Sequence, residues 1–159
     1  MNNLLSSSGM KGMLPTVWLV ICAMSFGGAM QESGLLKRIS DPIMLHAKKT
    51  GSLIATTSAT CFFFNITTSD QYLSIVVPGK MFEKTFKDKG LAPENLSRTL
   101  EDSGTVTSVL IPWNTCGAAQ SAVLGVATLA YLPFCFFNLI SPVMTLLYGY
   151  LNIKIKKIN

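Results

Sequence analysis

The sequence predicts an all-α integral membrane protein with about four membrane segments, some of them broken or re-entrant. Charged residues are absent from three long stretches, 12–31 and 50–69 with 20 residues each and 103–153 with 51 residues. A helix of about 20 apolar residues crosses a hydrocarbon layer of ~30 Å. Asp, Glu, Lys and Arg make up 13% of the chain and hydrophobic residues 49%, whereas about a quarter of a soluble domain is charged.

Several functional classes have no support in the composition. The net charge is +5, but no basic stripe interleaved with aromatic residues indicates a nucleic-acid partner. The single histidine, His46, lies in a basic loop, and the four cysteines are far apart without metal-ligand spacing. The sequence has no catalytic triad, phosphate loop or metal cluster. We therefore expect neither an enzyme nor a resident cofactor or metal.

The first membrane helix is expected at 13–30. Pro15 fits its first turn, where the missing N–H of proline removes no hydrogen bond, and the helix ends in the small residues of SFGGAM. A polar loop with four Lys or Arg residues follows at 31–49.

The stretch 50–79 is expected to be a broken or re-entrant segment. It is apolar at both ends but has the polar sequence NITTSDQ at 65–71. Polar side chains are costly against lipid, so we expect the helix either to end at the membrane interface or to break around a polar cavity inside the protein. The apolar pattern resumes at SIVVPG and is expected to end at Pro78 and Gly79.

The rest of the chain is predicted as a charged loop at 80–102, then a broken segment and two helices at 103–151. The loop has five basic and five acidic residues and includes two short surface helices. The polar sequence SGTVTSVLIPWNTCG precedes two spans, at about 118–132 and 133–151. We expect the whole chain, 1–159, to form one membrane domain.

Basic residues give the predicted orientation. The loops 31–49 and 80–102 and the C-terminal KIKK stretch are expected on the cytoplasmic side, where positively charged loops are retained. The segments 50–79 and 103–151 must then each return to the side from which they start.

Asp70 is the first candidate ion ligand, because an ionisable residue at membrane depth indicates ion or proton movement. Its neighbours supply the neutral oxygens that hard cations such as Na⁺ prefer. These neighbours are Asn65, Thr67, Thr68 and Ser69. The alternative interpretation is an aspartate that caps a helix at the membrane interface.

A second oxygen-rich stretch follows Asp102. Its polar residues are Ser103, Thr105, Thr107, Asn114 and Thr115. Arg98, one helical turn before Asp102, is expected to pair with it. Two apolar segments with polar interruptions indicate an inverted-repeat secondary transporter, in which helix ends and exposed carbonyls coordinate ions.

Three stretches resemble the NhaC-type sodium/proton antiporters, a family that includes malate/lactate antiporter relatives: NITTSDQYLSIVVPGKMF, LSRTLEDSGTVTSVLIPWNTCGA and LGVATLAYLPFCFFNLISP. The opening NLLSSSGMKGM and the sequence SFGG are also similar, so the resemblance covers essentially the whole chain. Val109 and Ala127 stand where the family pattern has proline. Because members of the family are several hundred residues long, the chain resembles the C-terminal third of such a transporter.

The resemblance implies a secondary transporter that exchanges Na⁺ for H⁺ across the cytoplasmic membrane. The polar motif residues of the family then correspond to Asn65, Asp70, Asp102, Ser103, Thr105, Asn114 and Thr115. Na⁺ and H⁺ are expected to bind one carboxylate alternately.

Three readings of the function stay open. The chain is a fragment or one part of a split Na⁺/H⁺ antiporter, a non-transporting subunit or degenerate remnant, or part of an organic-acid antiporter. The expected partners are the lipid bilayer and the N-terminal remainder of the transporter, a homologous subunit or a second copy of the chain. Gly117, Ser121 and Gly125 are expected to form a packing face for such a partner.

Overall fold

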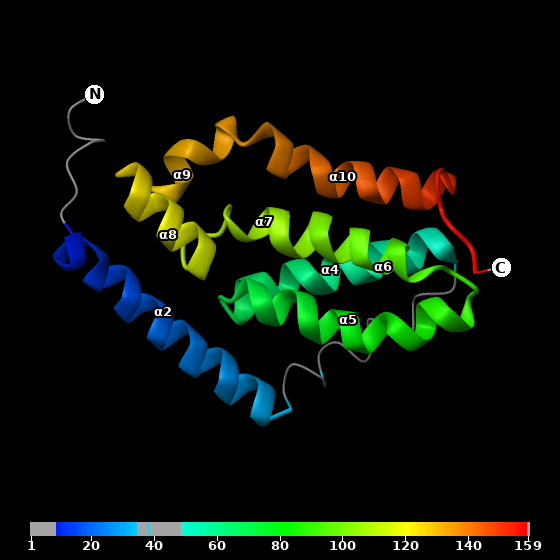
Figure 1. The fold of residues 1–159 in the computed structure, drawn as a ribbon, viewed down its shortest axis with the longest axis horizontal. Coiled ribbons are helices and arrows are strands. Elements are labelled where there is room, and N and C mark those ends of the chain that lie inside the picture. Colours follow the sequence, from blue (N-terminus) through cyan, green and yellow to red (C-terminus); the bar gives the residue numbers. More distant parts are fainter. Residues whose placement is uncertain (1–8, 35–37, 39–48, 159) are drawn as a thin grey trace.

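The computed structural model describes residues 9–34, 38 and 49–158, which contain helices and one isolated antiparallel bridge between Leu91 and Lys157. The predicted all-α architecture is therefore confirmed for this part of the chain. Helices α4, α5 and α6 with α7 form a central group, and α10 lies along α4 and α7 (Figure 1).

Helix α2 spans Gly9–Glu32 and packs against α8 at the edge of the central group (Figure 1). It contains the predicted helix 13–30 but begins earlier, so Pro15 lies in its second turn instead of its first. Most of the predicted basic loop 31–49, including His46, lies outside the described residues.

Helices α4 (Thr50–Thr67) and α5 (Gln71–Asp88) form an antiparallel hairpin with a tight turn at 68–70 (Figure 1). Ser69 adopts the left-handed backbone conformation, with φ 57°, and so reverses the chain. Asp70 then caps α5, because its carboxylate accepts a hydrogen bond from the Tyr72 N–H at 3.0 Å.

The predicted end of this segment at Pro78 and Gly79 is wrong, because α5 continues to Asp88. Phe82 and Phe86 lie one turn apart in the apolar core and extend the buried face of the helix beyond the proline. Proline removes one helical hydrogen bond, but Pro78 is itself buried and the helix remains continuous.

The predicted loop 80–102 is mostly helical. After α5, one continuous helical rod consists of α6 (Pro93–Leu100), the π-helical turn η1 (Glu101–Thr105) and α7 (Val106–Ser108). Pro93 occupies the first turn of α6, where proline is tolerated. The π-helical turn contains Asp102, and such turns frequently occur at functional sites.

The last part of the chain folds into α8 (Thr115–Leu124), α9 (Thr128–Tyr131), the 3-10 turn η2 (Leu132–Phe134) and α10 (Phe136–Leu151). Gly125 ends α8 with φ 69°, so the region predicted as a span at about 118–132 contains a helix break. Among the described residues, no single helix has both the length and the apolar composition to cross a membrane. The segments 115–124 and 128–134 meet both requirements only together, with a bend of 81°.

The small residues expected to face a partner have contacts inside the chain. A Cβ atom at Gly117 would lie 2.0 Å from the Ile111 carbonyl oxygen, so only glycine allows the preceding loop to pack there. The Ser121 hydroxyl donates to the Val126 carbonyl at 2.6 Å, and Gly125 terminates α8. Gly117 therefore has a packing role inside this chain, and a partner face that includes Ser121 and Gly125 stays a prediction.

The apolar core lies at the open end of the α4–α5 hairpin. It consists of Leu53, Ile54, Phe82, Phe86, Leu91 and Leu96. Here Asn95 donates to the Lys156 carbonyl at 2.6 Å and accepts from the Lys156 N–H at 3.1 Å. Gly51 lies against Tyr150 at the same end. The start of α4, where Lys49 is the N-cap residue, the α5–α6 connection and the basic C-terminal stretch are therefore at the same end of the molecule (Figure 1).

Candidate ion-binding site at the crossing of two helix breaks

Two interruptions of helical structure meet at the end of the hairpin opposite the apolar core. One is the turn 68–70 between α4 and α5, and the other is the loop 109–114 between α7 and α8. The Thr115 N–H donates to the Ser69 carbonyl at 2.9 Å and so joins them. We call this region the crossing and define it as residues 65–71 and 113–116.

Asn65 and Asn114 form the centre of the crossing, and both are completely buried. The Asn65 side-chain nitrogen donates to the Gly104 carbonyl at 2.7 Å and to the Thr107 hydroxyl at 3.1 Å. The Asn114 side-chain nitrogen donates to the Asn65 side-chain and backbone oxygens at 3.1 and 3.2 Å. The Asn114 side-chain oxygen also caps α8 through the Cys116 N–H. Because buried amides are costly without such partners, these bonds fix the relative position of the two breaks.

Asp70 and Thr68 belong to the same region. Asp70 is 8% exposed, and within the described chain no cationic side chain forms an ion pair with it. One carboxylate oxygen caps α5, so the capping interpretation is correct, but it leaves the second oxygen for another ligand. The buried Thr68 hydroxyl donates to the Phe64 carbonyl at 2.7 Å. Nearby, the Trp113 indole N–H donates to the Ile66 carbonyl at 2.9 Å.

Asp102 contacts α10 and makes no described hydrogen bond to the crossing. Its carboxylate accepts hydrogen bonds from the hydroxyls of Ser141, at 3.0 Å, and of Thr145. The predicted pair with Arg98 is wrong, since the Arg98 guanidinium donates to the Lys154 carbonyl at 3.2 Å. The π-helical turn that begins at 101 alters the four-residue alignment on which that prediction rested.

Ser103 and Thr105 also lie outside the crossing. The Ser103 hydroxyl is buried and has no hydrogen-bond partner among the described residues. The Thr105 hydroxyl donates to the Glu101 carboxylate at 3.0 Å. Of the predicted ligands, the crossing therefore brings together Asn65, Thr68, Asp70, Asn114 and Thr115.

Sequence reasoning missed several residues near these groups. The Cys116 thiol donates to the Gln71 side-chain oxygen at 2.6 Å across the crossing, and no spacing rule connects those two residues. The sequence does give a signal for Ser141 and Thr145, which lie one turn apart on a mainly apolar helix. That pair of hydroxyls on one helix face was a signal for a polar partner such as Asp102.

Two interrupted helices that meet through buried polar groups are the arrangement of secondary transporters with discontinuous helices. The sequence profile of the Na⁺/H⁺ antiporter family matches residues 1–153. The chain belongs to the Na⁺/H⁺ antiporter family, which is a family of transporters and not of enzymes. The resemblance inferred from the motifs is confirmed, and membership of this family implies a membrane location.

Individual relatives show the range of the family. The chain is 40% identical over 156 residues to the Na⁺/H⁺ antiporter NhaC of Alkalihalophilus pseudofirmus. The aligned region covers 98% of this chain and 34% of the relative. It is 36% identical over 153 residues to the arginine/ornithine antiporter ArcD of Halobacterium salinarum, with 96% and 32% covered. It is 31% identical over 150 residues to the malate-2H⁺/Na⁺-lactate antiporter of Bacillus subtilis, with 94% and 32% covered.

The chain thus spans about a third of the length of the curated relatives it matches. No solved structure matches it.

Proposed function

We propose that the chain supplies the cation-binding part of a Na⁺/H⁺ antiporter in the cell membrane, where Na⁺ and H⁺ compete for Asp70. The crossing supports this most strongly. It combines a buried carboxylate that has no cationic partner among the described residues with the neutral oxygens of two interrupted helices. In secondary transporters, unwound carbonyls and helix ends at such breaks coordinate ions.

The chemistry of the crossing suits a hard cation, which prefers oxygen ligands. The second oxygen of Asp70 supplies the charge, and neutral oxygens come from Asn65, Thr68, Asn114 and Thr115. Amide, carbonyl and hydroxyl oxygens have two lone pairs each, so those already in hydrogen bonds retain capacity for an ion. A proton on Asp70 removes the negative charge and thereby releases Na⁺.

Asp102 is proposed as a second carboxylate on the ion path. Ser141 and Thr145 hold it at the junction of the rod with α10, one residue from Ser103 and one turn from Thr105. Gly104, between them, accepts a hydrogen bond from Asn65. Through Gly104 the π-helical turn connects Asp102 to the crossing.

Exchange of organic acids has less support from the crossing. A carboxylate substrate needs a cationic or strongly donating partner, and residues 65–71 and 113–116 contain no Lys, Arg or His. The one charged group in these two segments is Asp70. The local charge therefore favours a cation.

The surface supports lipid and a larger protein as partners. Large apolar side chains are exposed from α8 to α10, among them Val123, Leu129, Phe134 of η2, Phe137 and Val143. Exposed apolar surface of this extent marks a membrane or protein contact. We propose that the membrane covers part of it and the remaining two thirds of the transporter covers the rest.

A chimera tests the proposed function. In it, this chain replaces the matching third of the Alkalihalophilus pseudofirmus antiporter, and Na⁺-driven proton flux is measured in vesicles. We expect flux with the chimera and none with the relative from which that third has been deleted. An inserted but inactive chimera would favour a non-transporting remnant. Flux driven by malate, lactate or arginine but not by Na⁺ would favour exchange of organic substrates.

A further inference from the structure

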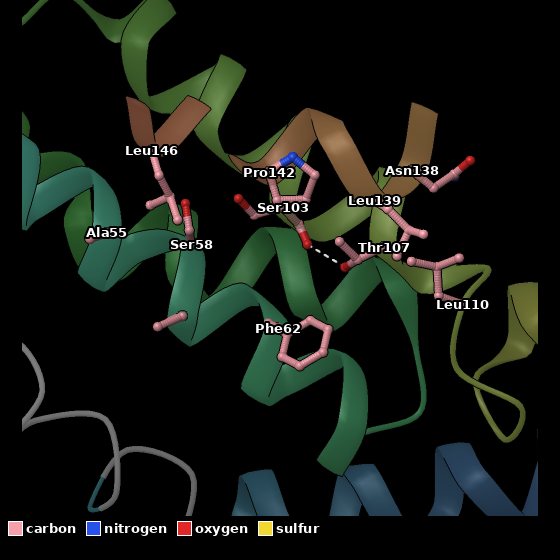
Figure 2. Close-up of a pocket in the computed structure, with 11 residues that line it drawn as sticks. Ala55, Ser58, Phe62, Ser103, Thr107, Leu110, Asn138, Leu139, Pro142 and Leu146 are labelled. Atoms are coloured by element: carbon pink, nitrogen blue, oxygen red, sulfur yellow. Dashed lines mark hydrogen bonds between the residues drawn. The ribbon is translucent and has the colours of Figure 1, made fainter. Parts of the chain in front are cut away.

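A pocket of about 360 Å³ lies between α4, the rod and α10 (Figure 2). Its walls are mainly apolar and include Ala55 and Phe62 from α4, Leu110 after α7, and Leu139 and Leu146 from α10. None of the residues that line it is Asp, Glu, Lys, Arg or His. Its volume is within the range of small-molecule sites.

Two serine hydroxyls at the pocket have no hydrogen-bond partner. Ser58, 7% exposed, and Ser103, 2% exposed, both line it (Figure 2). Their oxygens are the buried side-chain polar atoms without a partner in the described part of the chain. A buried hydroxyl without a partner costs free energy, and such exceptions require a specific explanation.

Other buried hydroxyls on the same helices do form hydrogen bonds. On α4, the hydroxyls of Thr57 and Thr60 donate to the carbonyls four residues earlier, at 2.9 and 2.8 Å. On the rod, Thr99 does the same at 2.8 Å. Ser58 and Ser103 make no such bond, although each lies on a helical segment. Their hydroxyls therefore have unused hydrogen-bonding capacity.

We propose that this pocket binds an uncharged amphiphile whose hydroxyl group bonds to Ser58 and Ser103 while its apolar body contacts the pocket walls. The absence of charged lining residues argues against an ionic ligand, which would lose its hydration without compensation. Water alone is a poor occupant, because a buried water needs two to four polar partners and the walls are mostly apolar. A hydroxyl ligand can donate to one serine and accept from the other.

The size of the pocket limits the ligand. Its volume equals roughly a dozen water molecules at ~30 Å³ each, which suits one medium-length chain. Both serines line the pocket, and rotation about the Cα–Cβ bond of each serine can turn its hydroxyl toward a ligand. Neither serine is among the proposed Na⁺ ligands, and the test of the pocket does not depend on transport.

The test uses the full chain in lipid nanodiscs and a photoreactive eight-carbon alcohol as the probe. Labelling should map to peptides that contain Phe62 and Leu139, and 1-octanol should compete better than octane or octanoate. Ser58→Ala and Ser103→Ala should each weaken labelling roughly fivefold, the effect of one lost net hydrogen bond. Ser97→Ala, which removes an exposed hydroxyl from α6, is the matched control and should have no effect.

The melting temperature, measured without the probe, distinguishes a folding defect from a binding defect. Serine to alanine removes the hydroxyl, and removing an unsatisfied buried hydroxyl leaves stability unchanged or raises it. Both alanine variants should therefore melt at or above the temperature of the original chain. Competition by a short-chain diacylglycerol would identify a lipid as the natural source, and competition by the free alcohol alone a soluble amphiphile. Equal labelling of the double alanine variant, or equal competition by octane, would overturn the proposal.

Discussion

At the scale of single residues, Asp70 has one observed role and one proposed role. One carboxylate oxygen caps α5 through the Tyr72 N–H, and in the proposed ion site the charge of the group holds Na⁺. Asparagine caps a helix about as well as aspartate. An amide at this position therefore keeps the fold and removes the charge, which makes Asp70→Asn a direct test of the proposed ion site.

The first prediction is that Asp70→Asn abolishes Na⁺-dependent proton flux in the assembled chimera while membrane insertion is unchanged. The flux is lost because an amide neither carries the charge that holds Na⁺ nor takes up a proton. Flux in vesicles and the amount of inserted protein are the two measurements. Asp88→Asn, at the exposed end of the same helix, is the matched control and should transport normally. Full activity of Asp70→Asn would leave the residue with a capping role only.

Asp102 depends on its α10 partners in a different way. Two hydroxyls from α10 bind the same carboxylate, so this one side chain joins the rod to α10 at two points. A further bond between the two comes from the Asn138 side chain, which donates to the Val106 carbonyl at 2.7 Å. Hydrogen bonds to a charged acceptor are worth about 1.5–3 kcal/mol each.

The second prediction is that Thr145→Val lowers the free energy of unfolding by about 1.5–3 kcal/mol. Valine keeps the branched shape but does not donate to Asp102. Thr145→Ser keeps the donor and should lose much less, which separates the hydrogen bond from the packing. Thermal unfolding of the chain in detergent measures both variants, and equal losses in the two would assign the effect to packing.

At the scale of helices, the loop 109–114 packs against α8 only because residue 117 has no side chain. The Ile111 carbonyl oxygen and carbon would lie 2.0 and 2.9 Å from a Cβ at Gly117, closer than van der Waals contact allows. The carbonyl is part of the backbone and cannot move aside like a flexible side chain. Any side chain at this position therefore displaces the loop that positions Asn114.

The third prediction is that Gly117→Ala destabilises the chain by about 1–3 kcal/mol, the usual range for overpacking. Because the loop shifts, the variant should also reduce Na⁺-driven flux in the chimera. Gly28→Ala in α2, where a Cβ would meet nothing within 4 Å, is the control. That variant should be neutral or stabilising, since alanine favours the helix interior. Normal stability and flux of Gly117→Ala would contradict the tight packing.

The sequence indicated the helical breaks better than their contacts. Polar residues within apolar chain predicted interruptions at 65–71 and 103–117, and both regions contain a break because buried polar backbone and side chains need partners. The sequence did not indicate that α5 continues beyond Pro78. The helix continues because Phe82 and Phe86 pack in the apolar core, and this packing involves residues far apart in the sequence. The partners of Asp102 depend on how α10 lies along the rod, which no local pattern encodes.

The fold likewise brings some of the predicted ligands to the crossing and not others. Asn65, Asp70 and Asn114 lie at helix breaks, where a polar residue in apolar sequence is itself the signal, and the fold brings them together. Ser103 and Thr105 belong to the same polar stretch but fall on other faces of the rod. Both lie within the π-helical turn, which α7 separates from the loop that contains Asn114, and such a turn has no reliable sequence pattern.

At the scale of the whole molecule, the basic segments lie together. Lys49, the α5–α6 connection and the C-terminal stretch meet at the apolar-core end (Figure 1), and α4 and α5 run away from that end and back. Positive-inside bias places such a cluster on the cytoplasmic side.

The fourth prediction follows from this arrangement. In a cysteine-free chain, single cysteines at Lys49, Lys84 and Lys157 should all be protected from an impermeant thiol reagent added outside cells. All three lysines are exposed in the structure, so the membrane and not burial in the protein would account for the protection. Labelling after permeabilisation confirms that each thiol is reactive. External labelling at Lys84 alone would make the hairpin a full crossing of the membrane.

The fifth prediction is that this chain alone does not transport. Ion sites of repeat-based transporters form between two related bundles, and this chain spans about a third of the relatives it matches. An intramembrane carboxylate needs protein or water around it, because exposing one to lipid costs ~2.5–3.5 kcal/mol on insertion scales. The chain should insert into vesicles without Na⁺-driven proton flux. Robust flux from a chain shown to be monomeric would contradict this.

The pairing of Asn95 with Lys156 has a mechanical consequence. Backbone bonds at the same place, from Ala92 N–H to the Lys156 carbonyl at 3.1 Å and from Ile158 N–H to the Gly90 carbonyl at 2.8 Å, tie the end of α10 to the start of the rod. Backbone hydrogen bonds thus join the C-terminal stretch and the start of the rod at the basic end, whereas side chains join α10 and the rod elsewhere, among them Asn138, which donates to the Val106 carbonyl at 2.7 Å. We expect any relative motion of α10 and the rod to pivot about the basic end. An ion bound at the crossing would lie far from that pivot.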